Sequence, residues 1–250
     1  MRSWITSGIR ILSVADLHYQ LRQLDWVASV APDFDLVVLA GDLLDVSSIV
    51  APDAQIAVVH QYLRRLADVT TVVVCSGNHD LDAENAHGER AAGWLGTARD
   101  AGVFVDGTSF GTATELVTVC PWWDGPRTRD DVDAQLAADA AILDERRRIW
   151  AYHAPPDASP TSWTGTRHYG DEDLGGWIER HSPDLVLCGH VHQSPFETPG
   201  GWMDRIGSTV VVNAGRQPGP EPTCIEIDTD AGVASWRSYL GIDERPLTPA

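Results

Sequence analysis

The chain has 250 residues, of which 43% are hydrophobic and 22% are charged, a balance typical of a folded domain with a sizeable core. All 18 basic residues are arginine and none is lysine, which excludes chemistry that depends on a lysine side chain. The 36 acidic residues bring the net charge to −18, which argues against tight binding to long nucleic acids, since contacts to many phosphates need clustered positive charge.

Short apolar runs with the length and β-branched content of buried strands recur along the chain. They cover residues 9–14, 36–40, 71–75, 103–105, 115–120, 149–152, 185–188, 209–213 and 224–227. Amphipathic helical patterns lie between them at 20–30, 54–66, 89–101, 132–147 and 171–181. This alternation predicts parallel βαβ units, and the helix-free part after residue 192 predicts an antiparallel addition. We expect a single domain over residues 1–250, with a loose C-terminal tail over about 243–250.

The sequence also favours a cytoplasmic location. No signal peptide is expected, because Arg10 interrupts the first apolar stretch, and no run approaches the length of a membrane span. The four cysteines lie beside apolar runs without the spacing of a metal-binding motif, so they are expected to be buried thiols in a reducing compartment.

Five short clusters of potential metal ligands each follow a predicted strand. Any one of them alone is more often a turn or a structural residue, but their joint occurrence is hard to explain without a shared site. Alternate residues of an extended segment point the same way, so two such ligands can share one metal. The ends of neighbouring parallel strands meet at one edge of a sheet, where we expect the clusters to converge. In chain order they are Asp16-Leu17-His18, Gly41-Asp42, Gly77-Asn78-His79-Asp80, His153 and Gly189-His190-Val191-His192.

This set resembles, motif for motif, the calcineurin-like metallophosphoesterase superfamily. The resemblance implies an α/β fold, a four-layer α/β/β/α sandwich of two mixed β-sheets flanked by helices. It further implies two divalent metal ions that share Asp42 as a bridging ligand. The other ligands would be Asp16, His18 and His192 for one ion, and Asn78, His153 and His190 for the second.

The ligand chemistry points to hydrolysis of a phosphate ester. Nitrogen and oxygen ligands suit Mn²⁺, Fe, Zn²⁺, Ni²⁺ or Mg²⁺. Two such ions can hold a bridging hydroxide that attacks phosphorus. The resemblance implies that His79 lies beside the scissile phosphate without touching a metal, where it would protonate the leaving oxygen or stabilise its charge. The expected substrate is a small phosphomonoester or phosphodiester. A nuclease or a cyclic-nucleotide phosphodiesterase is the alternative within this chemistry, and a non-catalytic scaffold is disfavoured because every ligand is kept.

Asp45 is a candidate second catalytic residue. It occupies the place of the acidic residue that orients the catalytic histidine in protein Ser/Thr phosphatases, so the resemblance implies that it orients His79. The alternative for Asp45 is a helix N-cap or an exposed carboxylate. Those phosphatases continue with an arginine where this chain has Val46, which argues against that subfamily. Asp80 is a second candidate for orienting His79.

Substrate binding is expected in loops outside the motifs. Trp122 and Trp123 lie in a Gly/Pro-bounded loop and are expected to wall the substrate pocket, with a packing corner as the alternative. The long loop at 154–170 contributes Arg167 and His168, and Arg167 or Arg127 could meet a phosphate. The turn that ends at Arg216 is a further candidate to line the site.

Overall fold

The computed structural model describes residues 8–142 and 144–248, and two packed β-sheets form its centre. The first sheet has seven strands in the order β15-β14-β13-β1-β2-β3-β6. Its β1, β2, β3 and β6 run parallel, and β13, β14 and β15 add to β1 as antiparallel strands. The bounds are β1 Arg10–Val14, β2 Leu36–Ala40, β3 Thr71–Cys75, β6 Phe104–Val105, β13 Cys224–Asp228, β14 Val233–Ser238 and β15 Gly241–Pro246.

The second sheet has six strands in the order β11-β12-β10-β9-β8-β7. Its four central strands are parallel, and the two edge strands, β7 and β11, are antiparallel to their neighbours. Each sheet therefore carries a parallel block whose strands end at one edge. The bounds are β7 Thr108–Gly111, β8 Glu115–Val119, β9 Arg147–Ala151, β10 Leu185–Cys188, β11 Met203–Ile206 and β12 Thr209–Asn213.

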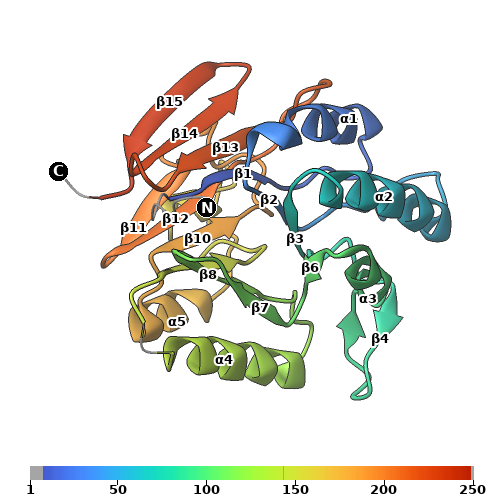
Figure 1. Cartoon of the computed structure of the whole chain (residues 1–250), viewed down its shortest axis with the longest axis horizontal. Helices are drawn as coiled ribbons and strands as arrows, with labels where there is room; N and C mark the ends of the chain where they lie inside the picture. The colour runs from blue at the N-terminus through green and yellow to red at the C-terminus, as the bar shows by residue number, and fades with distance from the viewer. Residues whose placement is uncertain (1–7, 143, 249–250) are drawn as a thin grey trace, which may run out of the picture.

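Helices cover the outer face of each sheet. Helices α1 (Leu21–Val30), α2 (Pro52–Ala67) and α3 (Leu95–Ala98) pack on the first sheet, and α4 (Pro126–Ala140) and α5 (Leu174–His181) on the second (Figure 1). Strand β2 shows why, because Val37 and Leu39 face the helices while Val38 and Ala40 face the other sheet. The predicted four-layer sandwich is thereby confirmed. Within the described residues, no helix has both the length and the apolar character needed to cross a membrane.

The helix predicted at 89–101 is mostly absent. Only α3 and a 3₁₀ turn at Arg99–Ala101 are helical, and a small hairpin of β4 (Ala83–Glu84) and β5 (Arg90–Ala91) precedes them. The Glu89 carboxylate accepts the backbone N–H of Arg127, and the Arg90 N–H donates to Asp124. These partners lie more than thirty residues away, so the local sequence pattern that predicted a helix contains no information about them.

Two further boundaries differ from the prediction. Helix α4 begins at Pro126 rather than at residue 132, as suits a proline in a first helical turn, and residue 147, its predicted end, instead opens β9. The tail predicted to be loose from residue 243 instead forms β15, an edge strand paired with β14 over residues 241–246. Most side chains of β15 are exposed, so its pairing rests on backbone hydrogen bonds. The sequence of this strand therefore has no alternating apolar pattern that would predict it. Residues 249–250 of that tail lie outside the described residues.

Candidate metal centre and active site

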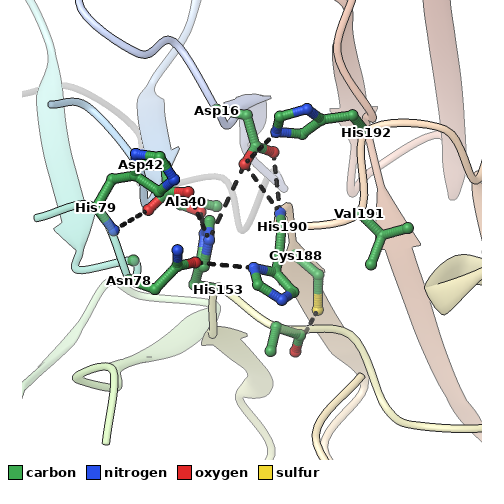
Figure 2. Close-up of polar contacts among 12 residues, drawn as sticks. Asp16, Ala40, Asp42, Asn78, His79, His153, Cys188, His190, Val191 and His192 are labelled. Carbon is green, nitrogen blue, oxygen red and sulfur yellow. Dashed lines mark hydrogen bonds and ion pairs between the residues drawn. The ribbon is translucent and has the colours of Figure 1, made fainter. Parts of the chain in front are cut away.

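The five motifs converge where the parallel blocks of the two sheets end. The loops after β1, β2 and β3 bring in Asp16 and His18, Asp42, and Asn78 and His79, whereas the loops after β9 and β10 bring in His153, His190 and His192. Figure 2 shows Asp16, Asp42, His153, His190 and His192 turned toward one another across the gap between the sheets. The edge where ligands were expected is therefore formed by both sheets together.

One group of potential ligands lies around Asp16. The Asp16 Oδ1 atom is 3.4 Å from His192 Nε2 and 3.9 Å from His18 Nε2, and the two Nε2 atoms are 3.2 Å apart. These three side chains offer one ligand atom each, all within 4.8 Å of one another. They correspond to three of the four residues predicted for the first ion.

A second group lies around Asp42. Its Oδ2 atom is 3.4 Å from His153 Nε2 and 3.8 Å from His18 Nε2, which places Asp42 between the two groups. Asp42, His153 and His190 form a compact ligand group, and the His190 Nδ1 atom lies 2.9 Å from the Asn78 Oδ1 atom. The arrangement suits a carboxylate shared by two ions.

The geometry of His153 tests whether the site fits a metal. Its Nδ1 atom lies 2.6 Å from the Ala40 carbonyl oxygen, to which it donates, so Nε2 is the nitrogen that can offer a lone pair to a metal once its own proton has left. That Nε2 atom is buried and has no hydrogen-bond partner within residues 8–142 and 144–248. A buried polar atom without a partner is costly, and a second-shell carbonyl that orients a ring in this way is typical of metal-binding histidines. The nitrogen and oxygen donors therefore fit a divalent metal.

Burial and charge prepare the ligands differently. Burial lowers the pKa of His18 to about 4, and burial with the neighbouring His153 lowers the pKa of His190 to about 4, so both rings are neutral at pH 7, the form that binds metal. Burial also acts to lower the pKa of His153, but the Asp42 and Asp16 carboxylates outweigh it and raise that pKa to about 9. A metal ion at His153 would therefore displace a proton.

The ligands occupy unusual backbone positions. Asp16, His18, Asp42 and His190 all have positive φ angles, of 56°, 42°, 54° and 67°. Such conformations are uncommon for residues other than glycine, and they cluster at functional sites where the surrounding structure enforces them. Here the strained turns point the ligands inward from the strand ends.

Asp80 and Asp45 both hold backbone rather than His79. The Asp80 carboxylate accepts the N–H groups of Asp42 at 2.7 Å and of Gly77 at 2.9 Å, which ties two motif loops together. The Asp45 carboxylate accepts the Ser47 N–H at 2.8 Å. The backbone N–H that reaches His79 Nδ1, at 3.4 Å, belongs to Val46. Within the described chain no hydrogen bond joins His79 to either carboxylate, so the structure does not bring Asp45 to His79 as predicted.

His79 itself lies at the centre. Its ring meets the His18 ring edge-on, with centroids 4.5 Å apart, and its backbone N–H donates to Asp42 Oδ1 at 2.8 Å. It also falls within one of the compact ligand groups, with His18 and Asp42.

A cavity of about 390 Å³ adjoins His153 and His190, and aromatic rings line it. The Trp122 ring centroid lies 5.2 Å from that of His190, and the Tyr169 ring stacks on His190 at 5.0 Å. The Trp123 Nε1–H donates to Asp171 at 2.7 Å, which anchors this ring at the cavity wall. Both tryptophans thus line a cavity beside candidate metal ligands, and their contact with a substrate stays a prediction.

The loop at 154–170 contributes a different residue from those predicted. Arg167 and His168 are exposed and are not among the cavity-lining residues. The His168 Nδ1 atom bonds back to Ser162 at 3.0 Å, and the Arg167 guanidinium lies over the Tyr169 ring at 5.5 Å. Tyr169 is the side chain of this loop that reaches the cavity, and no sequence signal distinguished it from its neighbours.

A second cavity, also of about 390 Å³, adjoins His192 on the other side and includes Arg216. The Arg216 N–H donates to the His192 carbonyl oxygen at 3.1 Å. Its Nε atom is buried and lacks a hydrogen-bond partner in the part of the chain that the structure describes. The turn that follows β12 thus places Arg216 in the lining of the same cavity as a potential metal ligand, with a backbone contact between the two residues.

Comparisons with known proteins agree with this geometry. The family model for calcineurin-like phosphoesterases matches residues 9–194. A UPF0046 protein from Caenorhabditis elegans is 26% identical over 228 residues, which is 84% of this chain and 71% of that protein. A dimetal phosphatase from Danio rerio superposes with a TM-score of 0.63 at 12% identity, over 97% of this chain and 99% of the other. A purple acid phosphatase from yellow lupin gives 0.55 at 15% identity, over 97% and 52%. At such identities the two solved structures show the shared fold.

Proposed function

Because the chain belongs to the calcineurin-like phosphoesterase family and is a metal-dependent phosphoester hydrolase, we propose that it acts through two divalent metal ions on a small phosphomonoester or phosphodiester. The observation that carries the proposal is that compact ligand groups adjoin one another at Asp42, whose Oδ2 atom lies 3.8 Å from His18 Nε2 and 3.4 Å from His153 Nε2. Asp42 would be the shared ligand. The others would be Asp16, His18 and His192 on one side and Asn78, His153 and His190 on the other.

The residues of the chain have separate tasks in this proposal. When bound, two dications lower the pKa of water and neutralise charge on phosphate oxygens. The Ala40 carbonyl holds the His153 ring with Nε2 facing inward. His79, in its protonated form, acts as the general acid that donates a proton to the leaving oxygen, a role that contributes typically ~10²–10⁴-fold.

Arg216 is proposed to contact a phosphate oxygen. It shares a cavity with His192, and its buried Nε–H lacks a protein partner among the described residues. A guanidinium offers several donors in a plane that matches phosphate oxygens. This assignment replaces the earlier expectation for Arg167, which lies exposed beside Tyr169.

A nuclease acting on long nucleic acid is the weaker candidate. The net charge is −18, and the cavity beside His153 is lined by four carboxylates and no arginine. A polyanion would meet repulsion on that side of the site.

The test is turnover and metal content together. Protein loaded with Mn²⁺ should hydrolyse a chromogenic aryl phosphate or the matching bis(aryl) phosphate, and the better substrate separates monoesterase from diesterase. Elemental analysis should approach two metal ions per chain. A protein that takes up no metal and hydrolyses neither ester with Mn²⁺, Fe, Zn²⁺, Ni²⁺ or Mg²⁺ would contradict the proposal.

A further inference from the structure

The cavity beside His153 and His190 combines aromatic and acidic walls. Four aromatic side chains and four carboxylates line it, and no arginine does. His153, whose buried Nε2 lacks a hydrogen-bond partner among the described residues, lines the same cavity, so the cavity adjoins the proposed metal centre. The aromatic residues are Trp122, Trp123, Tyr152 and Tyr169, and the acidic ones are Asp124, Asp171, Glu172 and Asp173.

Most of this negative charge is not neutralised by protein. Asp173 pairs with Arg129, whose Nε lies 2.6 Å from its Oδ2 atom. Asp171 accepts hydrogen bonds from the Trp123 ring and from the backbone N–H groups of Asp173 and Leu174. Asp124 and Glu172 are exposed, and in the described part of the chain neither they nor Asp171 form an ion pair. Three carboxylates therefore give the cavity a negative potential.

The electrostatic potential thus differs in sign between the two ends of the site: it would be positive at the bound metal ions and is negative at the carboxylates of the cavity. With its phosphate held at the metal ligands, a substrate would direct its alcohol portion along Trp122 and Tyr169 toward the carboxylates. Aromatic faces attract cations, and the carboxylates add to that attraction. A second anionic group on the substrate would instead be repelled by the same carboxylates.

From this arrangement we propose that the enzyme selects phosphate esters whose alcohol portion carries an ammonium group or no charge, and rejects esters that carry a second anionic group. The inference rests on the proposed function, because it takes His153 and His190 as the place where the phosphate is held.

Three aryl phosphates test the charge preference directly. They are the phosphate esters of 4-(2-aminoethyl)phenol, 4-ethylphenol and 4-(carboxymethyl)phenol. In each, aliphatic carbons separate the added group from the ring, so the acidity of the leaving phenol changes little. In low salt, kcat/KM should fall in that order, with about tenfold or more between the cationic and anionic esters. Raising the salt to about 0.5 M should narrow this ratio, because screening weakens contacts between exposed charges. Equal rates for the three esters, or a preference for the anion, would overturn the proposal.

A binding measurement keeps the two hypotheses apart. Metal-dependent hydrolysis of the neutral ester reports on the proposed function alone. The matching non-hydrolysable aryl phosphonates, titrated calorimetrically into Mn²⁺-loaded protein, should bind in the same order of charge. If the esters are not turned over but the phosphonates keep this order, the proposed reaction fails and the charge preference stands. Binding that is indifferent to charge would refute the preference, whatever the turnover.

A carboxylate variant with a matched control locates the effect. Glu172→Gln removes an unpaired charge from the cavity wall and should lower the ratio of cationic to anionic kcat/KM about threefold. Glu179→Gln makes the same change at an exposed position of α5 that does not line the cavity, and it should leave the ratio unchanged. A ratio that responds equally to both variants would show that the overall charge of the protein, rather than this cavity, sets the preference.

Discussion

Glycines of the motifs matter at the scale of single residues because the ligands leave them no room for a side chain. A Cβ atom on Gly41 would lie 2.2 Å from His153 Nδ1, and one on Gly77 would lie 2.2 Å from Asp42 Oδ1. Both distances are far below van der Waals contact, and Gly41 also has a φ of 89°. These glycines therefore allow ligands from different strands to approach one another.

Gly77→Ala should consequently disturb the ligands more than the fold. The added methyl group would push Asp42 and His153 apart, so metal content and activity should both fall. Gly176→Ala is the matched control, because it lies in α5 with nothing within 4 Å of its Cβ position and should stabilise the protein by about 0.4–1 kcal/mol. Full metal loading of Gly77→Ala, measured by elemental analysis, would contradict this account.

Substitutions of His79 and Asp42 should differ in their effect on the metal content of the protein. Asp42→Asn should lose metal and activity together, because the proposed bridge needs a negative ligand. His79→Ala should lose about 10²–10⁴-fold in kcat while keeping both ions, since only a proton donor is removed. Because His79 lies within one ligand group, an empty metal site in His79→Ala would show that it is a ligand instead.

Arg216→Gln should weaken phosphate binding. With its proposed contact removed, the inhibition constant for inorganic phosphate should rise by about tenfold, the equivalent of roughly 1.4 kcal/mol. Metal content should stay unchanged. Arg22→Gln removes the same charge from an exposed position of α1 outside the cavity and should not alter inhibition. Equal phosphate inhibition of wild type and Arg216→Gln would rule out the contact.

At the scale of elements, the loop between β8 and α4 gives its two tryptophans different surroundings. The backbone N–H of Trp122 donates to the Ser76 hydroxyl oxygen at 2.9 Å, and the Trp122 ring lies beside His190 and His153. Trp123 is anchored by its ring N–H to Asp171 and Tyr152. The Trp122 ring is thus placed to contact a substrate. The Trp123 ring also ties the loop to Tyr152 and Asp171.

Trp122→Ala should therefore act on binding. Loss of one stacking face costs about 1–3 kcal/mol by analogy with bases on aromatic rings, so KM for the natural substrate should rise roughly 5- to 150-fold. Trp123→Ala should in addition lower the melting temperature, because Asp171 loses a buried hydrogen bond worth about 1–3 kcal/mol. An unchanged KM with a lower melting temperature for Trp122→Ala would assign this ring to packing alone.

At the scale of the whole molecule, the proposed metal centre joins the two sheets. Its ligands come from three strands of the first sheet and two of the second, so bound metal would hold the sheets together at that edge. It would also offset part of the net charge of −18. Ligand binding to the folded state alone stabilises it by mass action.

Chelation should accordingly lower the melting temperature. A metal at about 1,000 times its dissociation constant adds roughly 4 kcal/mol, so exhaustive removal should cost several degrees, and Mn²⁺ should restore them. Asp42→Asn is the control, since it should melt at the same temperature with and without metal. Identical melting of chelated and Mn²⁺-loaded wild-type protein would argue against a metal that bridges the sheets.

The sequence by itself determined the fold class, the family and the chemical types of the candidate ligands. Each motif, such as the one that ends in Asp42, is a short apolar run followed directly by a ligand residue. Such a pattern lies within a few consecutive residues, so it can be recognised before the fold is known. The family match confirms the enzyme class, whereas the ligand assignments and the role of His79 remain predictions that the proximity of these side chains supports.

Only the tertiary structure decided which residues surround that centre. It directed the Asp45 carboxylate to the Ser47 N–H, put Tyr169 rather than Arg167 at the cavity, and paired β15 into the first sheet. These outcomes depend on contacts between distant parts of the chain, as when the His153 ring meets the Ala40 carbonyl 113 residues away. Packing of the two sheets sets such contacts, and no pattern among neighbouring residues encodes them.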